Sequence, residues 1–253
     1  MVNVYAYDKP QEIAAGLGKY ILKQQKYLIQ ESEQFTVAVL GGSLPKMLKR
    51  ALVDNKEVAD DIEWAQWVIY FVDERIVPLD HADSNYLELN KELLRHLKNP
   101  PKVVPIAALK VTGKDGQVDG ADLEKDKEIA KDYAAVLPDE INLGLLGVGP
   151  DGHTCSLFPD ADTLKVKDED VVAIHNSPKP PPRRVTFTLP RLRKVELLAF
   201  VAEGEGKKEA LAEIFNNPRS GLPAQVVNNN HEDVSWFVDN KALQDTNVHT
   251  SKY

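Results

Sequence analysis

Hydrophobic residues along this chain follow two spacings, one typical of helices and one typical of buried strands. Asp8 and Pro10 favour the start of a helix. The apolar residues that follow at near-helical spacing are Ile13, Leu17, Ile21 and Leu28. Short, mainly apolar runs, typical of strands buried on both faces, lie at residues 36–40, 67–72 and 141–146. Helices and strands are therefore predicted to alternate in the first part of the chain.

The same alternation continues to the end. Strands are predicted at residues 171–174, 185–189, 196–201 and 234–238. Further helices are predicted after residue 43, from a Ser84 cap through Leu87, Leu94 and Leu97, at about 121–136, and near 207–215. No repeat or low-complexity linker interrupts the pattern, and the prolines at 178 and 180–182 indicate a stiff connector. The sequence therefore predicts one α/β domain over residues 1–253.

Three polar segments stand where predicted strands end. They are residues 41–43, 73–75 and 147–153. In open α/β sheets, ligands bind beyond the carboxyl ends of the strands. We therefore expect these three segments to form one site.

Charge limits the classes of partner. The formal net charge is -8 at pH 7, so nucleic acid is not expected as the main ligand. An anionic substrate would need its own local cluster of cations and backbone amides. The sequence does not define the oligomeric state, and a monomer or weak homo-oligomer is the expectation.

Membrane and disulfide signals are absent from the sequence. No stretch approaches the roughly 20 apolar residues that cross a bilayer, and the first ten residues do not resemble a signal peptide. A single cysteine, Cys155, allows no internal disulfide and suits a reducing compartment. We predict a cytoplasmic protein with no membrane partner.

The segment Gly41-Gly42-Ser43 has the character of an anion-binding turn. Two glycines let a backbone approach an anion closely, and the next helix offers free N–H groups and the positive end of its dipole. The Ser43 hydroxyl adds a donor. An ordinary strand-to-helix turn is the equal alternative on spacing alone.

The segment 147–153 carries the strongest catalytic candidate. Its three glycines match the spacing of a dinucleotide-binding loop, but Pro159 follows too soon for the helix which that motif requires. His153 is a better interpretation, because a neutral imidazole accepts a proton near physiological pH. Asp151, two residues earlier, is placed to orient the ring.

Charged residues elsewhere leave alternatives open. Residues 73–75 (Asp-Glu-Arg) offer a guanidinium for a phosphate or an oxyanion, or form a local ion pair. Residues 80–83 (Asp-His-Ala-Asp) suggest a metal site, although a solvated loop is the better interpretation. Arg183, Arg184 and Lys207 add cations whose place the chain alone does not decide. No G-x-S-x-G elbow indicates a serine hydrolase.

In combination, these segments resemble the 6-phosphogluconolactonase family, most closely its fungal branch. The resemblance lies in residues 41–45, 73–78, 84–86, 145–159, 177–181, 184–190, 204–207 and 236–239. These pieces occur in the family's order and span nearly the whole chain. Two positions depart from the pattern: the family commonly has aspartate at Asn142, and an acidic or polar residue at Arg183. The charge of Arg183 is expected to alter the field at the phosphate.

The resemblance implies a Rossmann-like, mostly parallel sheet flanked by helices, related to glucosamine-6-phosphate deaminases. It also implies hydrolysis of 6-phosphoglucono-δ-lactone in the oxidative pentose phosphate pathway, with a phosphorylated sugar lactone as ligand and neither metal nor organic cofactor. The alternatives are an amino-sugar-phosphate isomerase or deaminase and a non-catalytic sugar-phosphate-binding protein.

The hypothesis for the site assigns four catalytic residues and five that bind the phosphate. His153 activates water, Asp151 positions the imidazole, and Arg75, held by Asp73, stabilises the developing oxyanion. The expected phosphate-binding residues are Gly41, Gly42, Ser43, Arg184 and Lys207.

Overall fold

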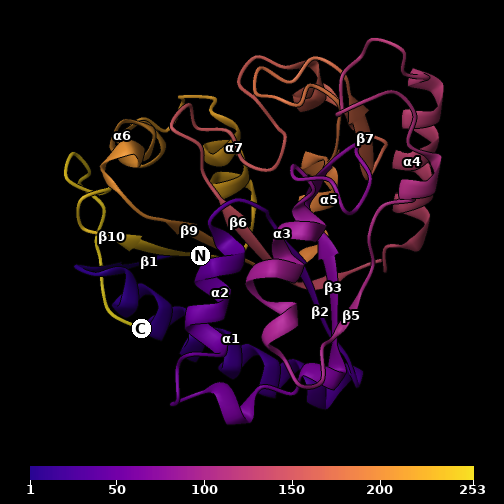
Figure 1. Cartoon of the computed structure of the whole chain (residues 1–253). Coiled ribbons are helices and arrows are strands. Elements are labelled where there is room, and N and C mark those ends of the chain that lie inside the picture. The colour runs from indigo at the N-terminus through magenta and orange to yellow at the C-terminus, as the bar shows by residue number, and fades with distance from the viewer.

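A parallel sheet of seven strands forms the centre of the computed structural model, which describes all 253 residues (Figure 1). Every pairing in this sheet is parallel. In spatial order its strands are β1 (Val2–Tyr7), β10 (Val234–Asp239), β9 (Val195–Ala202), β6 (Ile141–Gly147), β2 (Phe35–Val39), β3 (Trp67–Phe71) and β5 (Lys102–Val103).

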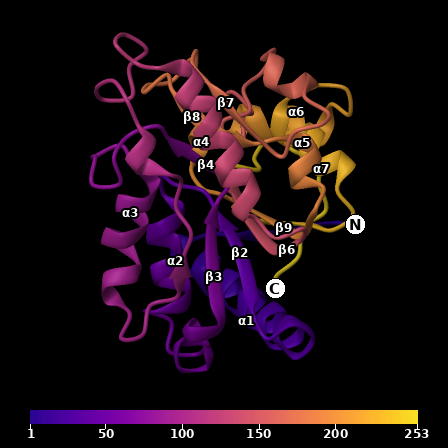
Figure 2. The ribbon, with the colours of Figure 1, turned by 90° about the vertical axis from the view of Figure 1, so that its right-hand side faces the viewer.

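Helices cover both faces of this sheet (Figure 2). One face carries α1 (Pro10–Ser32), α2 (Leu44–Leu52) and α3 (Asn85–Glu92). The other carries α4 (Leu123–Val136), α5 (Leu189–Leu192), α6 (Lys208–Asn216) and α7 (Pro223–Asn230). Short 3₁₀ turns lie at Ala59–Asp61, Trp64–Gln66, Leu94–His96, Ala108–Lys110, Asp162–Lys165 and Glu205–Lys207. No helix combines the length and apolar character needed to cross a membrane.

Side chains from each central strand enter two cores, one on either face of the sheet. Along β2, Val37 and Val39 pack with α1 and α2, whereas Ala38 faces the other core. Along β10, Phe237 faces the first core and Trp236 the second. This alternation explains the uninterrupted apolar runs, since parallel strands between two helical layers are buried on both faces.

A second, antiparallel sheet of three strands stands beside the first. Its spatial order is β4 (Asp73–Arg75), β8 (Arg184–Phe187) and β7 (Val171–Ile174). Asp73 pairs with Thr186 and Arg75 with Arg184. Residues 73–75 were expected only as a polar segment after a strand. In the structure they form the strand β4, which belongs to the three-stranded sheet.

Most predicted elements are confirmed within a few residues, and the exceptions have local causes. Ser84 caps α3 by accepting from the Leu87 amide at 3.3 Å, as predicted. The expected continuation to Leu97 is wrong, because the helix ends at Glu92 and only a 3₁₀ turn follows. The strand expected to reach Leu189 ends at Phe187, since Thr188 caps α5. The strands β1 and β5 and the helices α5 and α7 were not predicted.

The order of strands creates a switch point between β2 and β6. From β2 the chain continues outward to β3 and β5, whereas from β6 it continues the opposite way to β9 and β10. At such a point the loops after the two strands turn to opposite faces and leave a crevice at the carboxyl edge.

Candidate active site

A cavity of about 270 Å³ lies at this switch point. Loops after β2, β3, β6 and β9 contribute its lining, so the three segments expected to meet do meet. Eight of the nine predicted site residues line it: Gly41, Gly42, Ser43, Asp73, Arg75, His153, Arg184 and Lys207. Asp151, the ninth, contacts His153. The volume is just below the range of roughly 300–1,000 Å³ for small-ligand pockets.

The glycine turn after β2 leaves its serine free. Gly42 has a φ of +70°, a left-handed conformation that glycine adopts without strain. Ser43 directly precedes α2, and its hydroxyl makes no capping hydrogen bond. The Gly42 amide donates to a carboxylate oxygen of Glu88 at 3.1 Å. The Gly42 amide is therefore oriented toward an oxygen of the protein itself, and binding of a phosphate at this turn stays a prediction.

His153 is held by the folded loop in which it lies. The Gly149 amide donates to the His153 carbonyl at 2.8 Å, and Gly152 has a φ of +78°. The Nδ1 atom of His153 contacts the Asp151 carboxylate, and the ring stacks on Phe158 with 4.8 Å between centroids. These contacts fix the plane of the imidazole and leave Nε2 without a hydrogen bond to the protein.

Burial and charge favour a neutral imidazole. Burial lowers the pKa of His153, the Asp151 carboxylate opposes that shift, and the nearby Lys179 ammonium adds to it. Burial acts to raise the pKa of Asp151, but contact with His153 and the charge of Lys179 outweigh it and the pKa is lowered. Asp151 is thus an anion that accepts the Nδ1 proton, which makes Nε2 the basic nitrogen.

Replacing Gly149 with alanine should lower turnover by about 10²-fold, the cost of a misplacement of about 1 Å. A Cβ at Gly149 would overlap Nδ1 and Cε1 of His153, so the ring must move. Steady-state kinetics and a thermal melt are the measurements. The matched control is Gly206→Ala, which adds the same methyl where nothing lies within 4 Å. Equal kcat in the two variants would contradict this prediction.

The expected ion pair between Asp73 and Arg75 is wrong. Both residues project from the same face of β4, but residues two apart on a strand are about 6–7 Å from each other. Asp73 instead accepts hydrogen bonds from Ser156 at 2.7 Å and from Asn85 at 3.1 Å. Arg75 donates from Nη1 to the main-chain carbonyl of Asp83 at 2.8 Å.

The cations that line the cavity differ in how many donors remain free. Arg184 is buried and donates to the carbonyls of Lys179, Pro180 and Pro181 at 2.8–3.0 Å. Its Nη1 is 3.4 Å from the Ser156 hydroxyl, so few of its five N–H groups are left for a ligand. Lys207 makes no hydrogen bond through Nζ, and burial lowers its pKa, with the charge of Lys179 acting in the same direction.

Arg183 and Asn142, the two departures from the family pattern, both have structural partners. Arg183 is fully buried and binds Asp126 through two hydrogen bonds of 2.6 and 2.7 Å. Its charge is paired away from the cavity, so the expected influence on the phosphate site is not supported. The Asn142 carbonyl oxygen accepts from the amide and hydroxyl of Thr36, both at 2.9 Å, which ties β6 to β2.

Residues 80–83 lie in the loop between β4 and α3. No three His, Cys, Asp or Glu side chains gather where they would bind a metal ion. The His81 ring instead lies 3.3 Å from Asp115.

Lys179 and Asn85 are site residues to which the sequence argument gave no role. The Nζ atom of Lys179 is 3.3 Å from Asp151 and 3.2 Å from His153 Nδ1, and it donates to the carboxylate because Nδ1 carries a proton. Asn85 is buried, and its side-chain oxygen has no partner. The only sequence signal for Lys179 was its position between two prolines. Nothing in the order of residues indicated that Lys179 would lie beside His153.

Comparison with known proteins identifies the family. Residues 8–236 match the model of the family described as glucosamine-6-phosphate isomerases/6-phosphogluconolactonase. The chain belongs to this family. It is 39% identical over 249 residues to 6-phosphogluconolactonase 3 of Saccharomyces cerevisiae, covering 96% of this chain and 97% of the relative.

A second curated protein and one solved structure are also similar to this chain. A probable 6-phosphogluconolactonase of Schizosaccharomyces pombe is 37% identical over 247 residues, which cover 95% of each chain. The structure of 6-phosphogluconolactonase from Trypanosoma cruzi superposes with a TM-score of 0.82 and covers 98% of each chain. At 24% identity, that structural likeness shows the common fold.

Proposed function

We propose that this protein hydrolyses 6-phosphoglucono-δ-lactone to 6-phosphogluconate in the cavity at the switch point. The observation that carries the proposal is the His153–Asp151 pair, which leaves a basic Nε2 at a cavity lined by cations. The substrate has a phosphate dianion at one end and an electrophilic lactone carbonyl at the other. The cavity offers cations for the first and a base for the second.

In the proposed reaction, His153 takes a proton from water through Nε2 as the water oxygen attacks C1 of the lactone. A tetrahedral oxyanion forms, and Asp151 stabilises the imidazolium. The bond between C1 and the ring oxygen then breaks, and the imidazolium returns its proton to that oxygen. General-base help of this kind is worth about 10²–10⁴ in rate.

Arg75 is the proposed donor to the oxyanion. Its Nε is buried without a partner, and only Nη1 is used by the protein. A guanidinium with free N–H groups at a partly buried site stabilises charge that appears in the transition state. Asp73 then serves a different purpose from the expected one, since its contacts with Ser156 and Asn85 fix the loop after β6 and the start of α3 beside the cavity.

The proposed phosphate site comprises the Gly41-Gly42-Ser43 turn and Lys207, with Arg184 contributing charge and Lys179 adjoining. Four cations around one cavity, in a chain with a net charge of -8, supply the local positive field that an anionic substrate needs. Holding the phosphate fixes the distance from the lactone carbon to His153. Phosphate binding would displace Glu88 from the Gly42 amide.

The decisive assay generates the lactone in place from glucose 6-phosphate with its dehydrogenase and follows the disappearance of the lactone. The rate must exceed the spontaneous hydrolysis measured without the protein. A rate equal to the spontaneous one, with binding of 6-phosphogluconate retained, would favour the non-catalytic alternative. Release of ammonia from glucosamine 6-phosphate would favour the deaminase alternative.

The acid limb of the pH profile should lie below the ordinary histidine pKa of about 6.5. Burial lowers the pKa of His153, so the base form persists to lower pH and kcat/KM falls only as the ring finally gains a proton. In Asp151→Asn the limb should move lower still, because the carboxylate that favours the imidazolium is gone. Rates corrected for spontaneous hydrolysis at each pH measure this, and a limb that moves upward would contradict it.

Location and assembly stay predictions. We propose a cytoplasmic protein that acts as a monomer or weak homo-oligomer, with the single buried Cys155 in support of a reducing compartment. Cell fractionation and light scattering over a range of concentrations are the tests.

A further inference from the structure

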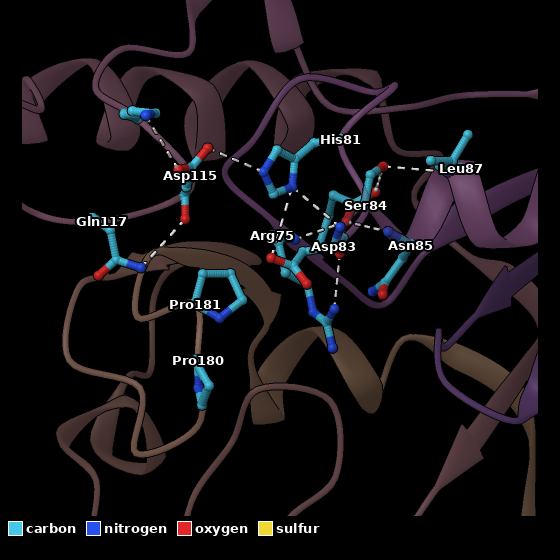
Figure 3. Close-up of polar contacts among 12 residues, drawn as sticks. Arg75, His81, Asp83, Ser84, Asn85, Leu87, Asp115, Gln117, Pro180 and Pro181 are labelled. Carbon is cyan, nitrogen blue, oxygen red and sulfur yellow. Dashed lines mark hydrogen bonds and ion pairs between the residues drawn. The ribbon is translucent and has the colours of Figure 1, made fainter.

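The guanidinium of Arg75 makes a single hydrogen bond to the protein, and that bond is to a loop carbonyl (Figure 3). Nη1 donates to the Asp83 carbonyl at 2.8 Å, whereas Nε has no partner. No carboxylate lies within ion-pair distance of this side chain, and Asp73 is occupied elsewhere. The direction in which Arg75 points therefore depends on what holds the main chain at Asp83.

His81 holds that main chain through one ring nitrogen. The Asp83 amide donates to His81 Nδ1 at 3.1 Å, so Nδ1 is an acceptor and the neutral ring carries its proton on Nε2. Nε2 lies 3.3 Å from the Asp115 carboxylate, to which it then donates. One tautomer satisfies both contacts. The Asp83 carbonyl that Arg75 binds belongs to the next peptide group, whose Ser84 amide donates to the His81 main-chain carbonyl at 3.0 Å. His81 therefore holds both peptide groups on either side of the Asp83 Cα.

Asp115 belongs to a second loop that is anchored independently. Arg183 donates to the carbonyls of Thr112 at 2.7 Å and Gln117 at 3.2 Å, and its amide donates to Gly116. Because Arg183 is itself buried against Asp126, the loop 112–121 is fastened to the small sheet. Asp115 extends from this fixed loop toward His81 (Figure 3).

We propose that His81 and Asp115 are positioning residues for Arg75. Hydrogen bonds run from Arg75 to the Asp83 carbonyl, from the Asp83 amide to His81, and from His81 to Asp115. The pair fixes the loop that directs the guanidinium into the cavity, and neither residue lines the cavity itself. This inference rests on the proposed function, in which Arg75 stabilises the oxyanion.

Two substitutions at Asp115 give a matched test. Asp115 has a φ of 51°, a conformation that asparagine and glycine both tolerate. Asp115→Asn keeps an oxygen acceptor for Nε2, and kcat should stay near that of the parent protein. Asp115→Gly removes the acceptor, and kcat should fall about 3- to 10-fold, as expected for one lost hydrogen bond. KM should change less than kcat, because Arg75 acts in the transition state.

His81→Phe removes both ring hydrogen bonds and keeps a planar ring, so it should lower kcat at least as much as Asp115→Gly.

Repeating Asp115→Gly in an Arg75→Met background separates an effect through Arg75 from a general disturbance of the structure. If the pair acts through Arg75, the second substitution should cause no further loss of kcat. Thermal melts of all variants check that the fold is kept.

Two results would overturn the inference: parental kcat in Asp115→Gly, or an equal loss of kcat in the Arg75→Met background. The Arg75→Met variant separates the failure of this inference from the failure of the proposed role of Arg75. Parental kcat in Arg75→Met would remove both the oxyanion role of Arg75 and the positioning role of His81 and Asp115. A large loss of kcat in Arg75→Met, with no effect of Asp115→Gly, would remove only the positioning role.

Discussion

Replacing His153 with alanine should lower kcat about 10²-fold or more while the Kd for 6-phosphogluconate stays nearly unchanged. The imidazole is the only general base that we assign, and a positioned base contributes about 10²–10⁴ in rate. The phosphate-binding turn and Lys207 are untouched by this substitution, so the product should still bind. Corrected initial rates and calorimetric titration are the two measurements.

Phe158 offers the control for this substitution, because it supports the ring without reacting. It is buried and stacks on His153, so Phe158→Leu should loosen the imidazole and lower kcat less than His153→Ala does. Unchanged turnover in His153→Ala would remove the base assignment. Product affinity lost together with turnover would mean that His153 mainly holds the cavity in shape.

Replacing Arg183 with methionine should lower the free energy of unfolding by about 3–5 kcal/mol, the usual cost of leaving one member of a buried ion pair alone. Both side chains of the Arg183–Asp126 pair have no exposed surface, so water cannot solvate the carboxylate that remains. Its one other neighbour of opposite character is the His175 ring, with Nε2 at 3.2 Å. The variant also loses the bonds to Thr112 and Gln117. Urea unfolding followed by circular dichroism measures the change.

The double variant Arg183→Met, Asp126→Leu tests the cause. With both charges gone, no unpaired charge remains in the place of the pair, and most of the lost stability should return. If the double variant is no more stable than Arg183→Met alone, the loss comes from the loop contacts and not from the orphaned carboxylate.

Residue patterns predicted the long central elements because the buried residues of these elements follow a regular pattern. Strands between two helical layers are apolar throughout, and α1 repeats its buried residues at helical spacing, so both signals are strong. The strand β1 is harder to detect because Asn3 interrupts its apolar run and its first two residues are not buried. The helix α7 ends in three consecutive asparagines, Asn228 to Asn230, which conceal its apolar face.

The sequence predicted which residues lie at the site better than it predicted which partners those residues contact. Glycine and charge at three strand ends indicated where His153 and the phosphate turn would meet. Which partner each side chain takes depends on distances across the cavity. Asp73 binds Ser156 across 83 residues of sequence, and Lys179 reaches Asp151 across 28. No spacing rule contains such pairs, which is why the Asp73–Arg75 prediction failed.

The pairing of β1 with β10 has a consequence for how the chain is completed. Val2 lies beside Val234, and each later residue of β1 has its partner in the last strand. A growing polypeptide can therefore not finish its sheet until about 230 residues have followed the first strand, and closing so long a loop is slow. During synthesis β1 is an unpaired strand with open hydrogen-bonding groups. In a chain that stopped before residue 234, β1 would have no β10 to pair with, and β9 would be an exposed edge strand.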